Sequence, residues 1–208
     1  MLNMHTLIAG VSGSGKSYTE KILVERIRET GGKLILLDPK RVELRQYRGE
    51  AMRYAADIDD CMDALQAADD LMHTRFRAME RNDETLYNGD PVYIVCDETA
   101  ALMHDKRNRR EALRLLYDIS FLGRAARVSL VLCTQRSTAD VIPRDITVNL
   151  ENIVCLRQRK PIDSRELIGI PDAANLPKVG YCYLSTPDLN RPVKVLSAEV
   201  WTRLEESC

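Results

Sequence analysis

The 208-residue sequence lacks several features that mark large classes of protein. It has no apolar run that approaches the roughly 18 residues of a membrane-spanning helix, and it has no internal repeat. With 45% hydrophobic and 29% charged residues, its composition excludes a collagen-like, low-complexity or disordered chain. No Gly-, Pro- or Ser-rich linker divides it, so we expect one domain that spans residues 1–208.

A large net charge of either sign is also missing. The chain has 30 lysines and arginines against 31 aspartates and glutamates, which gives a formal net charge of -1 and a pI near 6.3. Bulk charge therefore makes no case for a nucleic-acid partner, whose usual footprint is a basic domain with a pI above about 9. The cations are uneven, however, because 22 are arginines and 8 are lysines. Arginine favours planar, bidentate contacts with phosphate and carboxylate groups.

The six cysteines form no CxxC pair, and the three histidines have no metal-ligand spacing. Cys96, Cys133 and Cys155 lie in apolar runs that are typical of buried strands, which predicts free thiols in a reducing compartment. The first ten residues have no basic stretch, long apolar segment or small-residue cleavage site. We therefore expect no secretory signal and a cytoplasmic location.

What the sequence does contain is an alternation of short apolar runs with helical patterns. Strands are predicted at 5–10, 33–37, 92–96, 128–133 and 152–156, with two β-rich segments, 181–185 and 192–196, near the C-terminus. Helical spacing predicts helices over about 17–28, 57–81 and 109–126. The strand runs are continuously apolar, so the predicted fold is a mostly parallel α/β sheet with helices on both faces and a β-rich C-terminal end.

The first chemical motif, GVSGSGKS, starts at Gly10 and matches GxxxxGK[ST] between a predicted strand and a predicted helix. This context disfavours a chance match to a glycine-rich turn. Backbone N–H groups of such a loop surround a β-phosphate, and the helix N-terminus adds its positive dipole end. Lys16 would reach the β- and γ-phosphates of ATP, and the Ser17 hydroxyl would ligate Mg²⁺. The predicted nucleotide-binding residues are Gly10, Ser12, Gly13, Ser14, Gly15, Lys16, Ser17 and Tyr18.

The second motif is the apolar strand VYIVC followed by Asp97 and Glu98. At this position Asp97 would hold Mg²⁺ through water, and Glu98 would orient and deprotonate the water that attacks the γ-phosphate. Such a glutamate favours a hydrolysing motor over a kinase or a switch GTPase, and no guanine-reading NKxD motif occurs. The alternative is an acidic strand end that caps the next helix.

The third motif, Thr134-Gln135-Arg136, ends the strand LVLC. A polar residue here is expected between the strand before the glycine-rich loop and the strand before Asp97. There Gln135 can hydrogen-bond the γ-phosphate or the lytic water and report hydrolysis to the loop that follows.

Five segments together, HTLIAGVSGSGKS, LILLDPKRVEL, YIVCDETAALM, GRAARVSLVLCTQRSTADVI and KPIDSRELIG, resemble the motor domain of the FtsK/SpoIIIE family of DNA translocases, within the wider FtsK–HerA ATPases. The resemblance runs from about residue 5 to 200. It implies a RecA-like P-loop ATPase that assembles as a homo-oligomeric ring, usually a hexamer, around double-stranded DNA and pumps it. By position, Lys16 and Ser17 match the Walker A pair, Asp97 and Glu98 the Walker B pair, and Gln135 the sensor.

The resemblance also implies roles for residues outside these motifs. Arg124 falls where the family has an arginine finger that reaches the neighbouring subunit's nucleotide. By itself, it could equally be a cation that complements a helix C-terminus. The 157–165 stretch matches a segment with a second trans-acting basic residue, assigned here to Lys160, although Pro161 is extra relative to the family pattern. The cluster at 106–110 is interpreted as a solvated surface run. Candidate DNA contacts in channel-facing loops, independent of sequence and weakened by salt, are Arg136, Arg144, Arg157, Arg159 and Lys160.

The chain departs from the large members of this family, whose transmembrane anchors, linker and winged-helix domain do not fit in 208 residues. We therefore expect a minimal stand-alone motor, of the kind that phages, plasmids and integrative elements often encode, which a membrane-anchored partner could recruit. One alternative is a conjugative coupling or type VII-like protein-secretion ATPase. Another is a non-hydrolysing assembly module, against which the intact Glu98 and Gln135 argue.

Overall fold

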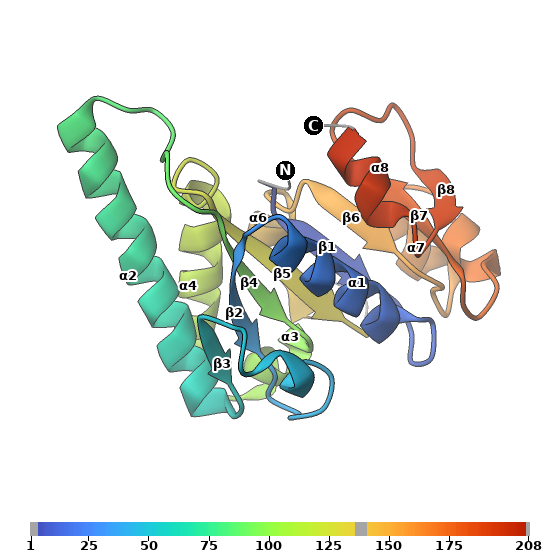
Figure 1. Ribbon diagram of the computed structural model, residues 1–208. Helices are drawn as coiled ribbons and strands as arrows, with labels where there is room; N and C mark the ends of the chain where they lie inside the picture. The colour runs from blue at the N-terminus through green and yellow to red at the C-terminus, as the bar shows by residue number, and fades with distance from the viewer. Residues whose placement is uncertain (1–3, 136–140, 207–208) are drawn as a thin grey trace.

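The computed structural model describes residues 4–135 and 141–206, built around an eight-stranded sheet (Figure 1). The strand order is β3-β2-β4-β5-β1-β6-β7-β8. Strands β1 to β6 are mutually parallel, and β7 and β8 run antiparallel at one edge. The strands are β1 (Thr6–Ala9), β2 (Lys33–Leu37), β3 (Arg53–Ala55), β4 (Val92–Cys96), β5 (Val128–Thr134), β6 (Asn152–Cys155), β7 (Tyr181–Ser185) and β8 (Val193–Leu196). The predicted mostly parallel sheet with a β-rich C-terminal end is confirmed.

Helices cover both faces of the sheet, as the continuously apolar strands require. One face packs against α1 (Lys16–Glu29), the 3₁₀ turn η1 (Arg45–Tyr47) and α8 (Val200–Glu206). The other face packs against α2 (Ile58–Asn82), α3 (Thr99–His104), α4 (Arg109–Leu122), α6 (Arg144–Thr147) and α7 (Pro161–Ile168), which the turn η2 (Asp172–Asn175) follows. Fold and motif order together match a RecA-like P-loop domain.

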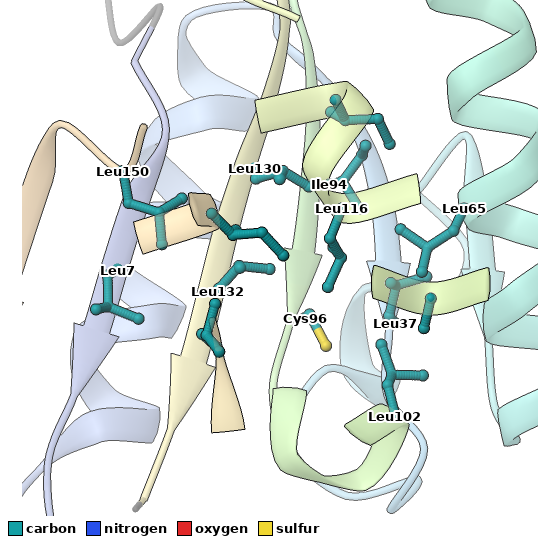
Figure 2. Close-up of a cluster of buried hydrophobic side chains, with 14 of the residues drawn as sticks. Leu7, Leu37, Leu65, Ile94, Cys96, Leu102, Leu116, Leu130, Leu132 and Leu150 are labelled. Carbon is teal, nitrogen blue, oxygen red and sulfur yellow. The ribbon is translucent and has the colours of Figure 1, made fainter. Parts of the chain in front are cut away.

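The larger of the two hydrophobic cores lies between the sheet and α2, α3 and α4 (Figure 2). Ile94 and Leu130 of the central strands meet Leu116 of α4 and Leu65 of α2, and each is fully buried. Burying one such side chain stabilises the fold by about 1.5–3 kcal/mol. This core fixes β4 and β5, and therefore the residues that follow them.

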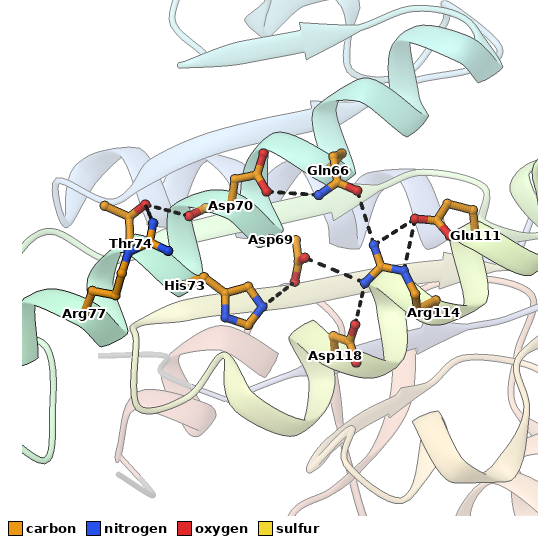
Figure 3. Close-up of polar contacts among 9 residues, drawn as sticks. All are labelled: Gln66, Asp69, Asp70, His73, Thr74, Arg77, Glu111, Arg114 and Asp118. Carbon is orange, nitrogen blue, oxygen red and sulfur yellow. Dashed lines mark hydrogen bonds and ion pairs between the residues drawn. The ribbon is translucent and has the colours of Figure 1, made fainter. Parts of the chain in front are cut away.

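A polar network joins the outer surfaces of α2 and α4 (Figure 3). Arg114 of α4 binds Glu111 and Asp118 at 2.7 Å each, and its guanidinium lies 3.9 Å from the carboxylate of Asp69 on α2. The Asp69 carboxylate also lies 3.7 Å from His73. Asp69 is buried, and this burial raises the pKa of its carboxyl group. The network therefore fastens the two helices at their edge, while the core below them supplies most of the packing.

The helix predicted over 109–126 ends earlier, at Leu122. A Cβ at Gly123 would lie 2.2 Å from the backbone oxygen of Val128, so only glycine fits where the chain turns back into β5. The Val128 N–H donates to the Gly123 carbonyl at 2.8 Å, which closes this turn. As a result, Arg124 lies in the turn and not in the helix.

The prediction that Cys96, Cys133 and Cys155 are buried, free thiols is confirmed. In the described part of the chain, five cysteines are free and buried: Cys61, Cys96, Cys133, Cys155 and Cys182.

Trp201 is 2% exposed and donates its indole N–H to the carbonyl of Thr19 at 3.0 Å, so it packs α8 against α1. Among the helices of residues 4–135 and 141–206, none combines the length and apolarity that a membrane crossing needs.

Candidate functional site

The three chemical motifs meet at one edge of the sheet because the strands that precede them are parallel. The glycine-rich loop follows β1, Asp97 and Glu98 follow β4, and Gln135 follows β5. Strand β5 lies between β1 and β4, which confirms the predicted strand position of Gln135 between the other two motifs.

The loop from Gly10 to Gly15 is curled tightly and is anchored on both sides. The Gly10 N–H donates to the Thr134 carbonyl at 3.1 Å, and the Val11 N–H donates to the Arg157 carbonyl at 3.0 Å. Gly15 has a φ of +92°, a conformation that side chains disfavour, and α1 begins at the next residue. This geometry directs loop N–H groups and a helix N-terminus at one point, as binding of a phosphate requires.

Lys16, the first residue of α1, is buried beneath this loop and contacts Asp97. Its ammonium donates to the Asp97 carboxylate at 2.8 Å and to the Asp97 backbone carbonyl at 2.9 Å. Burial opposes the charge on Lys16, but the surrounding Cys133, Glu20 and Asp97 side chains outweigh it and raise the pKa. Lys16 is therefore a fixed positive charge at the end of the loop.

Glu98 is 6% exposed, and its two carboxylate oxygens have different surroundings. One oxygen, Oε2, accepts a hydrogen bond from the ammonium of Lys40 at 2.9 Å. The other, Oε1, is buried and has no hydrogen-bond partner among the described residues. An oxygen of this kind costs about 1–3 kcal/mol unless it binds something further. Glu98 thus offers one oxygen that is held and one that is ready to accept a proton or a water.

Sequence analysis assigned no role to Lys40, although it lies in the quoted LILLDPKRVEL segment. Asp38, which follows β2, is fully buried and accepts hydrogen bonds from the backbone of Val42 and Leu44 at 3.2 Å each. These bonds fold the segment after β2 so that Lys40 reaches Glu98. Glu43 of the same segment pairs with Lys21 at 2.9 Å, and its hydrogen bonds to Lys21 and then Ser17 lower its pKa. The sequence does not show that β2 and β4 are neighbours in the sheet, which is what brings Lys40 close to Glu98.

Glu20 is a second residue that the sequence analysis missed. It lies one turn after Lys16, it is fully buried, and its Oε1 accepts from the Cys133 thiol at 3.5 Å. Burial, and next the carboxylate of Asp97, raise the pKa of Glu20 to about 8. An acidic residue on the buried face of a helix is rare. In the sequence, the helical spacing of Glu20 from Lys16 was the only sign of its place beside the site.

A cavity of about 990 Å³ opens beside the glycine-rich loop. Its walls carry Glu98, Lys40, Gln135, His104 and Lys160. A second pocket, of about 400 Å³, is lined by the glycine-rich loop itself, and Gln135 lines both pockets. The cavity is large enough for a terminal phosphate, the attacking water and a side chain from outside the chain.

The other predicted basic residues lie in different places. Arg124 is at the opposite, amino-terminal edge of the sheet, where its guanidinium binds Glu151 at 2.8 Å, so the chain does not bring it to its own phosphate loop. Lys160, expected to act on a neighbour, lines the cavity that contains Glu98 of the same chain. The extra residue Pro161 is the first residue of α7.

The remaining candidate DNA contacts are exposed. Arg157 and Arg159 flank the loop in a pocket of about 300 Å³, and Arg144 begins α6. Neither Arg157 nor Arg159 forms an ion pair with a described residue. Arg136 lies outside the described residues.

The site fits Mg²⁺ only together with a nucleotide. No group of three or more histidine, cysteine or acidic side chains in the described part of the chain could hold a metal ion by itself. Mg²⁺ prefers a few protein oxygens plus substrate phosphates and waters, and the Ser17 hydroxyl, the Asp97 carboxylate and the unpartnered Glu98 oxygen supply oxygens of that kind. Ser17 would contact the ion and Asp97 would hold it through water.

The comparisons with known proteins agree with this geometry. The family model "Helicase HerA, central domain" matches residues 1–56. The DNA translocase SpoIIIE of Bacillus subtilis is 29% identical over 220 residues, covering 93% of this chain and 28% of SpoIIIE. The chain spans less than a third of the length of the curated relatives it matches.

Solved structures show the same fold. The pCW3 conjugation coupling protein TcpA, in its monomer form with ATPγS, matches with a TM-score of 0.84 and 23% identity over 94% of this chain and 60% of TcpA. The type VII secretion ATPase EccC of Thermomonospora curvata matches with a TM-score of 0.75 and 22% identity over 92% of this chain and 25% of EccC. The resemblance to FtsK/SpoIIIE translocases is confirmed over more than nine-tenths of the chain, and the RecA-like fold is confirmed.

Proposed function

We propose that the chain is the motor domain of a ring that moves double-stranded DNA with energy from Mg²⁺-dependent ATP hydrolysis. The observation that carries the chemistry is Glu98, which lines a cavity beside the phosphate loop and whose buried Oε1 has no partner among the described residues. The similarity to DNA translocases over 93% of the chain supports the substrate. Free, buried thiols support a reducing, cytoplasmic location. The two cores share one sheet, which supports a single domain over residues 1–208.

In this proposal each residue has a defined task. The loop N–H groups bind the β-phosphate, and Lys16 exchanges its contact with the Asp97 carboxylate for the γ-phosphate. Glu98 takes the proton of the attacking water at Oε1 while Lys40 holds Oε2. When bound, Mg²⁺ neutralises charge that develops on the phosphates. Gln135, at the end of β5, contacts the γ-phosphate or the water.

What one chain lacks at its own site supports the ring. Arg124 lies at the far edge of the sheet, is 61% exposed at its side chain and is proposed to meet the nucleotide of another subunit. The proposed assembly is a homo-hexamer, in which Arg124 of each subunit enters the Glu98 cavity of the next. Arg144, Arg157, Arg159 and Lys160 are the proposed contacts to DNA phosphates.

One assay tests the proposal: the ATPase rate with and without linear double-stranded DNA, at 50 mM and 200 mM salt. We expect DNA to stimulate hydrolysis and the stimulation to fall at the higher salt, because phosphate contacts release counterions. Replacing Arg157 and Arg159 together by glutamine should reduce the stimulation and leave the DNA-free rate unchanged.

The structural similarity to TcpA and EccC favours one second candidate, a conjugative coupling or protein-secretion motor. Such a motor would hydrolyse ATP without a response to naked double-stranded DNA. Absence of turnover under every condition would instead indicate a structural, non-hydrolysing module.

A further inference from the structure

Two exposed apolar side chains stand beside the phosphate loop. Tyr18, in the first turn of α1, and Val179, just before β7, are each 58% exposed. Both line the 400 Å³ pocket that also contains Gly13, Gly15 and Ser17. Single exposed apolar residues are ordinary on a protein surface. Two that come from opposite ends of the chain and border one polar pocket call for a ligand.

The segment that carries Val179 is held against the loop. A Cβ at Gly13 would lie 3.1 Å from Cε of Lys178, and a Cβ at Gly15 would lie 4.0 Å from Cγ1 of Val179. The side chains of Lys178 and Val179 therefore cover these two glycines. The Ser197 N–H donates to the Gly180 carbonyl at 3.1 Å, which ties the segment to the end of β8.

The opposite wall is equally fixed. The indole N–H of Trp201 bonds the carbonyl of Thr19, the residue after Tyr18, so that α8 braces the first turn of α1. The backbone next to each apolar side chain is therefore held by a contact with α8 or with the end of β8. A backbone that is held in this way lowers the entropic cost of binding a flat ligand.

A nucleotide whose phosphates lie on the loop can extend in two directions. On one side is the large cavity, where Glu98, Lys40 and Lys160 present charge. On the other side are Tyr18 and Val179, which present an aromatic ring and a branched aliphatic group, together with the charged side chains of Lys16 and Glu43. A base has flat faces that stack on apolar groups of this kind. Charge is present on both sides, whereas Tyr18 and Val179 line only this one, and they favour placing the base here.

We propose that Tyr18 and Val179 form the base-binding platform for a purine nucleoside triphosphate, so that its γ-phosphate points to Glu98. This inference rests on the proposed function, because it takes the phosphates to lie on the loop. It adds Val179, from the C-terminal part of the chain, to the nucleotide site. It also gives the hairpin of β7 and β8 a task, which is to hold one wall of the platform.

The test compares two ligands by calorimetric titration in the presence of Mg²⁺: ATP and inorganic tripolyphosphate, which has the phosphates without the base. In Tyr18→Ala we expect ATP to bind about 10- to 100-fold more weakly, the range that loss of one stacking partner gives. Tripolyphosphate should bind within twofold of the wild type. Val179→Ser should weaken ATP binding several-fold with the same selectivity, and Tyr18→Phe should retain it. Phe121→Ala, an equally exposed aromatic residue of α4 away from the pocket, is the matched control and should change neither ligand.

Equal losses for both ligands in Tyr18→Ala would overturn the platform, because Tyr18 would then shape the phosphate loop. Unchanged ATP binding in both Tyr18→Ala and Val179→Ser would overturn it as well, since the base would lie elsewhere. The proposed function fails separately: if Lys16→Ala leaves tripolyphosphate binding intact, the phosphates do not lie on the loop at all.

Discussion

The two ends of the sheet both bury polar groups, but they satisfy them in different ways. At the carboxyl end, Lys16 and Glu98 are paired with other side chains, Asp97 and Lys40. At the amino end, Arg75 and His5 are bonded to the backbone. The Arg75 guanidinium donates to the carbonyls of Ala126 and Asp90 at 2.8 and 2.9 Å, for example.

His5 extends this contrast. It is 2% exposed, and its Nδ1 accepts the backbone N–H of Leu130 at 2.9 Å. A backbone partner cannot be exchanged without unfolding part of the sheet, whereas a side-chain partner can rotate away when a ligand competes for it. In these examples the side chains bonded to backbone hold the fold, whereas Lys16 and Glu98 can change side-chain partner when a ligand binds.

Arg124 is the residue at the amino end that should break this comparison, because it binds a side chain, Glu151, and is exposed. We expect Arg124→Ala to lower ATP turnover about 10³- to 10⁵-fold, as loss of an arginine finger does. Nucleotide binding and the thermal midpoint should stay unchanged. Arg110→Ala, in the first turn of α4, is the matched control and should turn over normally. Wild-type turnover per chain that is constant on dilution to the monomer would contradict a role in a neighbour's site.

Glu98→Gln tests the exchangeable group at the carboxyl end. The amide keeps the shape of the side chain but cannot accept the proton of the attacking water, so turnover should fall about 10²- to 10⁴-fold. ATP should still bind with a Kd close to that of the wild type. Steady-state hydrolysis and equilibrium binding measure the two quantities, and Glu80→Gln on the exposed face of α2 is the control. Turnover within tenfold of the wild type would exclude Glu98 as the base.

Arg75→Met tests the backbone-bonded group at the amino end. The substitution removes the donor for several carbonyls in a partly buried place, and we expect the free energy of unfolding to fall by about 2–3 kcal/mol. Chemical denaturation measures this change, and Arg77→Met, exposed on the same helix, should cost less than about 0.5 kcal/mol. ATP binding by the folded fraction should remain as in the wild type. A selective loss of nucleotide affinity would remove the distinction between the two ends.

A pH-dependent effect is expected at His5. Burial, and next the charge of Arg124, lower the pKa of His5 from 6.5 to about 4. Its contribution to stability is therefore complete above pH 6.5 and is lost as the pH falls toward 4, because only the unfolded chain takes up the proton in that window. The loss should reach about 3 kcal/mol near pH 4. Unfolding of the wild type and His5→Gln between pH 7 and 4 should show a shallower dependence in the variant; parallel curves would contradict the assignment.

The sequence predicted whatever depends on neighbouring residues along the chain. The phosphate loop, the acidic pair after β4 and the buried strands all have local signals, and the structure places them as expected. Lys40 and Val179 have none, because strand order brings Lys40 to Glu98 and a hairpin returns Val179 to the loop. Glu20 has only its helical spacing from Lys16. The early end of α4 depends on a backbone oxygen that only the folded chain brings next to Gly123.

The position of Pro161 has a consequence for the cation that precedes it. Proline is tolerated at the first residue of a helix, because the N–H that it lacks is not used there. Pro161 therefore begins α7 without disturbing the buried side of the helix, where Leu167 and Ile168 are packed. Lys160 directly precedes the helix, and its backbone N–H donates to the Asp163 carboxylate at 3.1 Å. The start of the helix thus fixes the backbone from which one cation reaches the wall of the cavity.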